Sequence, residues 1–183
     1  MLDRAGLVAA LQEAITRFGS IDVLEYSPTS SFDSMRGPKD IDVENEQFHL
    51  DLQVLGAIAA VRTVLPAMLE RQSGSLLFTT AASAQHPAVI TASFGVAAGA
   101  LLNYVRLLHK GLSTSGIHVG LVSIAGLVVP PGKDPSSSDF PPGIPLIDAD
   151  EIGSLHWDLH TTLQDPEVYA GDIEALLSNP RLY

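Results

Sequence analysis

The stretch Gly74-Ser-Leu-Leu-Phe-Thr-Thr80 decides the fold, because it is a short apolar run that begins at a glycine and ends in hydroxyl side chains. A run of this length and composition predicts a buried strand. Residues 21–26 and 117–124 predict two more strands. The second of these is almost continuously apolar, which suits a parallel sheet that is covered on both faces.

Helical patterns separate these strands. Asp3 can cap a first helix that ends at Gly19, and its apolar face would carry Leu7, Leu11, Ile15 and Phe18. Further helices are expected over 43–70, with a kink at Pro66, and over 92–113 and 148–163, and a weak last strand over 167–171. The alternation of strand and helix predicts a parallel sheet with right-handed crossovers.

Five segments, in order and at matching spacings, resemble the short-chain dehydrogenase/reductase family. They are Arg17-Phe-Gly-Ser-Ile-Asp-Val-Leu24, Gln53-Val-Leu-Gly56, Arg62-Thr-Val-Leu-Pro-Ala-Met68, Gly74-Ser-Leu-Leu77 and Ile117-His-Val-Gly-Leu-Val-Ser-Ile-Ala-Gly126. The resemblance implies an α/β, partial Rossmann-like three-layer fold. It also implies that the proline-rich segment 129–147 corresponds to the family's substrate loop.

The resemblance also implies which positions should carry the family's chemistry. In the family, a serine after a strand, a tyrosine and a lysine in Y-x-x-x-K, and a helix asparagine form the catalytic group. Here the corresponding residues are Ala81, Phe94, Ala98 and Gln53. The alanine and phenylalanine side chains can neither donate a proton nor carry a charge, so the family's standard reduction of a carbonyl is not expected.

The family's glycine-rich phosphate loop has no counterpart in this sequence, whose first residues match the stretch after the family's third strand. That loop binds pyrophosphate through close backbone approach and a helix N-terminus. No cofactor is therefore expected for this chain alone. NAD(P) becomes possible if missing sequence or a partner completes the site. The chain is interpreted as a natural truncation or as part of a longer protein.

Composition bounds the remaining possibilities. The 183 residues suit one domain over 1–183, and 46% apolar residues are ordinary for a globular protein. Zero cysteines exclude disulfides and thiol chemistry, and no metal site is expected. The net charge of −11 argues against nucleic acid and anionic membranes as partners. A cytoplasmic location is expected, with neither a signal peptide nor a membrane span.

A missing first half would leave the strand at 21–25 as an unpaired edge, which tends to pair with another chain. We therefore expect a homo- or hetero-oligomer. The family's dimers pack through helices that correspond here to about 43–70 and 92–113, so these helices and the edge strand are the expected interfaces.

Residues with remaining chemistry gather at the predicted carboxyl ends of the strands. His86, with Tyr26 or Ser83, could form an acid/base pair for a non-redox reaction; alternatively, His86 caps a loop and Tyr26 fills the vacated dinucleotide space. His156 and His160 have helical spacing. They could bind a metal, or could lie on a partly exposed face while Leu155 and Trp157 pack.

Three functions stay open at this point. The chain could be a pseudoenzyme that serves as a binding or oligomerisation subunit. It could be an NAD(P)-dependent oxidoreductase with an atypical site, known here only as a fragment. It could also be a repurposed non-redox enzyme centred on His86.

Overall fold

The computed structural model describes residues 2–130, 132–134, 143–162 and 166–180. Its main sheet has four parallel strands in the order β1-β2-β3-β6, which are β1 (Val23–Tyr26), β2 (Gly74–Ala81), β3 (Ile117–Ile124) and β6 (Glu167–Ala170). The predicted α/β fold and parallel sheet are confirmed. The strand β1 lies at one edge of this sheet, as expected.

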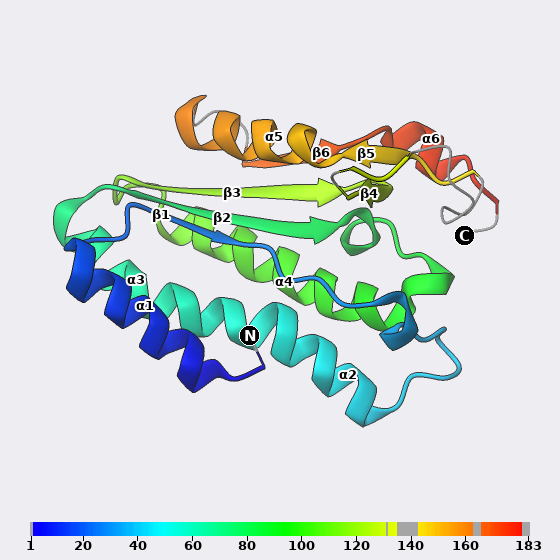
Figure 1. Ribbon diagram of the computed structural model, residues 1–183, viewed down its shortest axis with the longest axis horizontal. Coiled ribbons are helices and arrows are strands. Elements are labelled where there is room, and N and C mark those ends of the chain that lie inside the picture. Colours follow the sequence, from blue (N-terminus) through cyan, green and yellow to red (C-terminus); the bar gives the residue numbers. More distant parts are fainter. Residues whose placement is uncertain (1, 131, 135–142, 163–165, 181–183) are drawn as a thin grey trace.

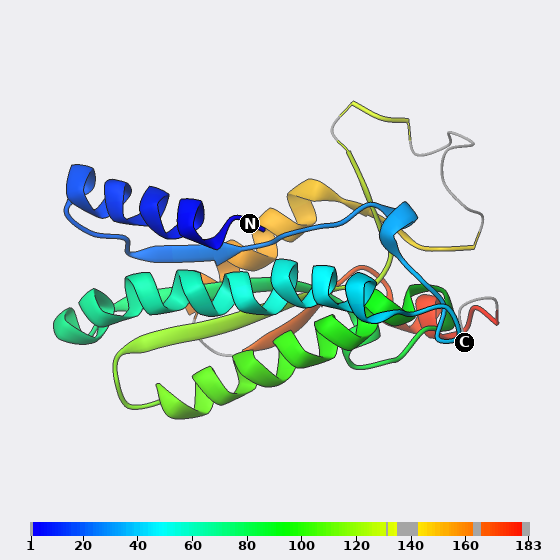
Figure 2. The same cartoon turned by 90° about the horizontal axis from the view of Figure 1, so that it is seen from below.

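Helices cover both faces of the sheet (Figure 1). One face is covered by α1 (Arg4–Phe18), by the long helix made of α2 (Val43–Leu50) and α3 (Gly56–Arg71), and by α4 (Ala92–Gly111). Figure 2 shows α1 beside β1 and α4 beneath β3. The opposite face carries α5 (Ala149–Thr162), which packs on β2 and β3.

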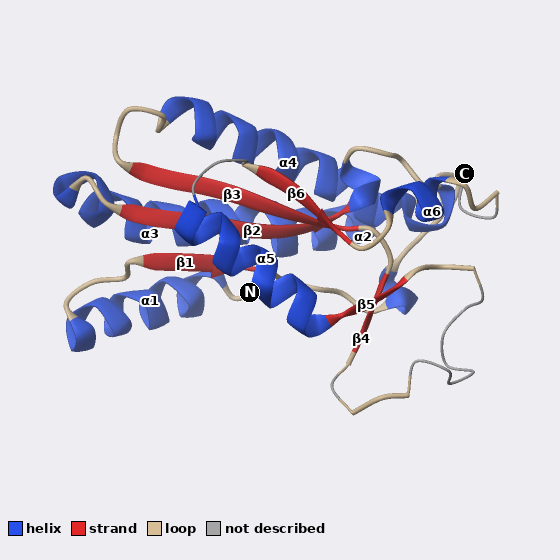
Figure 3. Cartoon of the chain, turned by 90° about the horizontal axis from the view of Figure 1, so that it is seen from above, coloured by secondary structure: helices blue, strands red, loops and turns tan. Residues whose placement is uncertain are grey.

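Short elements gather beyond the carboxyl ends of the strands (Figure 3). A small parallel pair, β4 (Leu127–Val129) and β5 (Leu146–Asp148), projects to one side, and α6 (Ile173–Leu177) follows β6. Most of the proposed substrate loop at 129–147, namely 131 and 135–142, lies outside the described residues.

Most of the buried apolar side chains among the described residues belong to two cores, which hold the layers together. The larger one lies between the sheet and the α3–α4 face, and its fully buried side chains include Met68, Phe78 and Leu101. The smaller one lies under α5, where Leu159 packs on Leu77 and Val122. Alternate residues of β2 therefore serve different cores, because successive side chains of a strand point to opposite faces.

The first helix packs along only part of its apolar face. Leu7 and Leu11 pack against the larger core as expected, but the Phe18 side chain is 72% exposed and lies beneath the guanidinium of Arg17. Phe18 is the last residue of the helix, so it extends beyond the layer that α1 shares with α3. Arg4 forms an ion pair with Asp51 at 2.5 Å and so joins α1 to the long helix.

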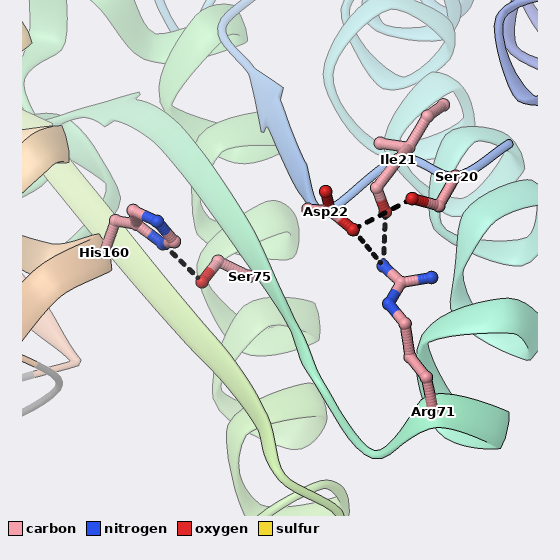
Figure 4. A network of polar contacts seen from close by, with 6 residues as sticks. All are labelled: Ser20, Ile21, Asp22, Arg71, Ser75 and His160. Atoms are coloured by element: carbon pink, nitrogen blue, oxygen red, sulfur yellow. Dashed lines mark hydrogen bonds and ion pairs between the residues drawn. The ribbon is translucent and has the colours of Figure 1, made fainter. Parts of the chain in front are cut away.

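Polar contacts fasten the amino ends of the strands, away from the candidate site (Figure 4). Arg71, in the last turn of α3, donates to the Ile21 carbonyl at 2.5 Å and lies 3.3 Å from the Asp22 carboxylate. On the other face of the sheet, Ser75 and His160 share a hydrogen bond of 2.8 Å, which ties α5 to β2.

Two helical segments, Val43–Arg71 and Val89–Gly111, are long and apolar enough to cross a membrane. Both pack against the sheet, and core helices of globular proteins commonly pass the same test of length and composition. They are therefore weak indications of a membrane span, and their apolar character is accounted for by the larger core.

Candidate functional site

A cavity of about 500 Å³ opens at the carboxyl ends of the strands. Its walls come from the loop after β1, the end of β2, the first turn of α4, β4, and single residues of α5 and α6. In open α/β sheets this edge is where ligands bind. The lining is mostly apolar and includes Phe32, Met35, Ile90, Ile124 and Leu127.

The residues at the family's catalytic positions lie in or beside this cavity. Ala81 and Phe94 line it, and Phe94 is 9% exposed. Ala98, one helical turn further along α4, is completely buried. No side chain that lines the cavity, among the residues that the structure describes, is Asp, Glu, His, Lys, Arg or Tyr. The lining therefore has no group that titrates near neutral pH.

The helix position of Gln53 keeps an unusual backbone. Residues Asp51–Leu55 form a π turn between α2 and α3, which the sequence pattern did not predict, and the Gly56 amide bonds to the Asp51 carbonyl. The Gln53 side chain is buried, and its amide reaches the Phe94 carbonyl at 3.4 Å. Such π turns are frequent at functional sites. Here the turn directs Gln53 at the backbone of α4 instead of at the cavity.

Tyr26 does not join His86 in a polar cluster, which corrects that part of the sequence prediction. Its side chain is 3% exposed within the larger core, and its hydroxyl donates to the Leu52 carbonyl at 2.7 Å. Burial raises the pKa of Tyr26 to about 12. The parity of β1 explains the difference, because Leu24 and Tyr26 point to the helix-covered face that holds the larger core.

His86 lies in the loop after β2 and pairs with Tyr169 of β6, whose hydroxyl is 3.1 Å from the His86 Nε2. His86 does not line the cavity. Ser83 does line it, but the Ser83 hydroxyl oxygen is buried without a hydrogen-bond partner and packs against Gly95. No hydrogen bond therefore joins the three residues, all described by the structure, that the sequence grouped as an acid/base site.

Sequence reasoning missed a second polar group, which lies at the α5 side of the cavity. Ser27 and Thr79 line the cavity, and their hydroxyls bond to each other. The Ser27 hydroxyl also bonds to the Glu25 carboxylate, and the Thr79 hydroxyl lies 2.7 Å from the His156 Nε2. The same His156 nitrogen is 3.6 Å from Glu25. Four side chains from β1, β2, α5 and the loop after β1 therefore form one chain of contacts.

Burial shifts the pKa at both ends of this series of contacts, Glu25 and His156. It raises the pKa of Glu25, although the hydrogen bond from Thr79 lowers that pKa in part. Burial also lowers the pKa of His156, whose side chain is 11% exposed. Both changes favour the uncharged forms, as expected for groups removed from water.

The two histidines of α5 contact the sheet and are partly buried, and the expectation that Trp157 packs is corrected. His156 contacts Thr79 and His160 contacts Ser75, whereas Trp157 is 66% exposed. The helix turns this way because Leu159, in the same stretch, fills the smaller core. Across the described part of the chain, no group of three or more His, Asp or Glu side chains could hold a metal ion.

The described residues do not fit a nicotinamide dinucleotide by themselves. The cavity lining offers no cation for a phosphate, and the family's lysine position is the fully buried Ala98. The chain leaves β1 and β2 through loops with short 3-10 turns, Phe32–Ser34 and Ala82–Ala84, and not directly through a long helix whose N-terminus could hold a pyrophosphate.

The parallel sheet, its helical layers and a cavity at the carboxyl ends of the strands define a Rossmann-type α/β protein. The sequence profile described as short chain dehydrogenase matches residues 1–135. The chain belongs to this family.

The curated relatives that the chain matches are described as oxidoreductases. The chain is 27% identical over 113 residues to an uncharacterized oxidoreductase of Staphylococcus epidermidis, a match that covers 62% of this chain and 48% of that protein. The chain thus spans about half the length of the curated relatives it matches.

Solved structures show the same fold at low identity. A short-chain dehydrogenase from Streptomyces avermitilis has a TM-score of 0.78 at 18% identity, covering 96% of this chain and 70% of that one. L-sorbose reductase from Gluconobacter frateurii, solved with NADPH and L-sorbose, has a TM-score of 0.78 at 19% identity, covering 94% and 74%.

Proposed function

We propose that this chain is a non-redox, ligand-binding member of the short-chain dehydrogenase family, which holds a small uncharged apolar molecule in the cavity. The observation that carries this proposal is the cavity lining. Ala81 and Phe94 stand where the family has its proton donors, and no lining side chain among the described residues titrates near neutral pH. Apolar walls with a few neutral polar groups are typical of small-molecule sites.

Physical chemistry supports an uncharged ligand. An ion moved from water into such a cavity would lose its hydration and would find no opposite charge on the walls. A neutral apolar molecule gains about 25 cal/mol for each Å² of apolar surface that it buries. A cavity of about 500 Å³ is within the usual size range of ligand pockets.

The proposal is tested with N-phenyl-1-naphthylamine, an uncharged probe whose fluorescence rises in apolar surroundings. We expect saturable binding that Ala88→Phe weakens at least about tenfold, because the added ring occupies cavity volume. Ala10→Phe, at an exposed position of α1, is the matched control. Failure to bind the probe would contradict the proposal, as would NADH- or NADPH-dependent reduction of a carbonyl compound by the purified chain.

The second candidate function is an NAD(P)-dependent oxidoreductase of which this chain forms a part. The family match and the names of its relatives favour it. It requires residues from other sequence or from a partner to hold the dinucleotide, because the described lining supplies no cation. Calorimetric titration with NADH and NADPH separates the two candidates, since micromolar binding would favour the oxidoreductase.

The third candidate, a non-redox enzyme centred on His86, has less support, because His86 lies against Tyr169 and does not line the cavity. Unchanged activity in His86→Ala would exclude it, whatever reaction is found.

Association with a second chain is also a proposal. Leu55, Leu69, Val96 and Leu107 are exposed apolar residues on the long helix and on α4, and Val23 on the edge strand β1 is 39% exposed. The family resemblance assigns the two helices to contacts, and an unpaired edge strand tends to pair with another chain. Light scattering tests whether the protein associates. Neither nucleic acid nor a membrane is proposed as a partner, and a cytoplasmic location stays a prediction.

A further inference from the structure

We propose that the Ser27–Thr79 wall of the cavity recognises a hydrogen-bond donor, so that the preferred ligand is an apolar molecule with a hydroxyl group. This inference deepens the proposed binding function and rests on it. It starts from the chain of contacts that joins Glu25, Ser27, Thr79 and His156.

Which group donates in each of these hydrogen bonds follows from the carboxylate of Glu25 at one end of the series. When Glu25 is ionised, its carboxylate only accepts hydrogen bonds, so Ser27 donates its one hydrogen to Glu25. Thr79 likewise gives its one hydrogen toward the acidic end, either to the Ser27 hydroxyl or to the Glu25 carboxylate itself. Thr79 has no hydrogen left for His156, so the His156 Nε2 carries a hydrogen and donates it to Thr79.

The other ring nitrogen of His156 agrees with this assignment. His156 Nδ1 is buried and has no hydrogen-bond partner. A neutral ring with its hydrogen on Nε2 leaves Nδ1 as a bare acceptor, whereas a charged ring would bury an unpaired N–H donor. The lowered pKa of His156 points to the same neutral form.

Both hydroxyls therefore meet the cavity as acceptors. The hydrogens of Ser27 and Thr79 are already used in hydrogen bonds directed toward Glu25. Each hydroxyl oxygen accepts one hydrogen bond and keeps a second lone pair free. The nearby carboxylate strengthens the acceptor character of Ser27, because hydrogen bonds in a chain polarise one another. Ser27 is exposed within the lining and is thus accessible to a ligand.

Most other hydroxyls of the lining are closed to a ligand; the exception is Thr29, which is exposed and whose hydroxyl donates to the Ser30 carbonyl at 3.5 Å. The hydroxyl oxygens of Ser30, Thr80, Ser83 and Thr91 are buried, with less than 1 Å² of accessible surface each. They face protein atoms, whereas Ser27 opens toward the space that a ligand would occupy.

The test compares 1-(2-naphthyl)ethanol with 2-acetylnaphthalene, which differ only in carrying a hydroxyl or a carbonyl. Each displaces N-phenyl-1-naphthylamine from the full chain, and the ratio of the two dissociation constants is measured. We expect the alcohol to bind about tenfold more tightly, because the ketone oxygen meets two acceptors with no hydrogen between them.

Three variants make this result specific. Ser27→Ala should bring the ratio close to one. Glu25→Gln should shift the preference toward the ketone, because the glutamine amide can donate to Ser27 and release the Ser27 hydrogen into the cavity. Thr16→Val, which removes a hydroxyl from the outer helix α1, should leave the ratio unchanged.

The outcomes separate this inference from the function on which it rests. Tight binding of both compounds with equal affinity, or a preference that Ser27→Ala and Glu25→Gln leave intact, would overturn the inference and leave the binding function standing. Failure of the naphthylamine probe and of both compounds to bind would overturn the two together.

Discussion

The hydroxyl of Tyr26 donates a hydrogen bond to the carbonyl oxygen of Leu52 across 2.7 Å, and so joins the end of β1 to the π turn. The contact is buried in the larger core. Its position explains why Tyr26 takes no part in the cavity, although it directly precedes the cavity residue Ser27. The tyrosine is a structural link between the sheet and the long helix.

Removal of this hydroxyl should destabilise the fold. In Tyr26→Phe the Leu52 carbonyl loses its donor in a buried setting, which costs about 1–3 kcal/mol. Urea denaturation measures the loss. Tyr104→Phe, at the partly buried tyrosine of α4, serves as the control and should change the free energy of unfolding by less than about 0.5 kcal/mol. Equal effects of the two variants would contradict the role given to Tyr26.

Gly56 should be required because the tyrosine hydroxyl approaches it closely. A Cβ atom at Gly56 would lie 2.0 Å from the Tyr26 hydroxyl oxygen, so Gly56→Ala forces one of them to move. A double-mutant cycle with Tyr26→Phe tests this. We expect Gly56→Ala to cost less in the Tyr26→Phe background, by about 1 kcal/mol or more. Additive effects would show that the clash is relieved elsewhere.

Restoring the family's lysine should damage the fold before it restores any chemistry. Ala98 is completely buried in α4, so Ala98→Lys would place a long cationic side chain where no space exists. We expect a loss of about 3 kcal/mol or more in the free energy of unfolding. Ala100→Lys, exposed on the same helix, should be close to neutral. A stable Ala98→Lys variant would indicate that the lysine position opens readily to the cavity.

The stability of the fold should fall as the pH is lowered from 8 toward 5.5. Burial lowers the pKa of His156 from the ordinary 6.5. Burial, and then the charges of His109 and His160, lower the pKa of His118. As the pH falls, the unfolded chain therefore binds protons at these histidines near pH 6.5, whereas the folded chain binds them only at lower pH. The stability that the two neutral histidines contribute is present above pH 6.5 and is lost below it.

Two variants test this pH dependence. His156→Gln and His118→Gln should each flatten the curve of unfolding free energy against pH, by up to about 1.4 kcal/mol for each unit of pKa difference removed. The raised pKa of Glu25 has the opposite sign and acts closer to its ordinary value of 4.5, so the measurement stays above pH 5.5. An unchanged slope in both variants would exclude these histidines as its cause.

Local pattern was enough to predict most of the fold. The apolar runs of the three main strands and the spacing within the helices gave the order of elements, because strand and helix periods are properties of neighbouring residues. Helical spacing placed Phe18 on the apolar face of the first helix, but spacing identifies a face and not how far the covering layer extends.

The candidate site, like the fold, was predicted from the sequence only in part. The inert residues Ala81, Phe94 and Ala98 were identified from the resemblance to the family's motif, and the structure places two of them on the cavity wall and the third in the adjacent interior. Sequence spacing could not show whether His86 and Tyr26 lie together. Their proximity depends on which faces of two segments, distant in the sequence, meet in the fold.

The sequence by itself determined the order of the strands and helices, which depends on residue type and spacing, and its resemblance to the family indicated that inert residues stand at the catalytic positions Ala81, Phe94 and Ala98. Only the tertiary structure decided that Glu25, Ser27, Thr79 and His156 form one chain of contacts. The parallel register that sets Tyr26 beside Phe78 brings the next residues of the two segments together, and the packing of Leu159 turns His156 toward them. Contacts between residues distant in sequence are fixed by register and packing, which no local pattern contains.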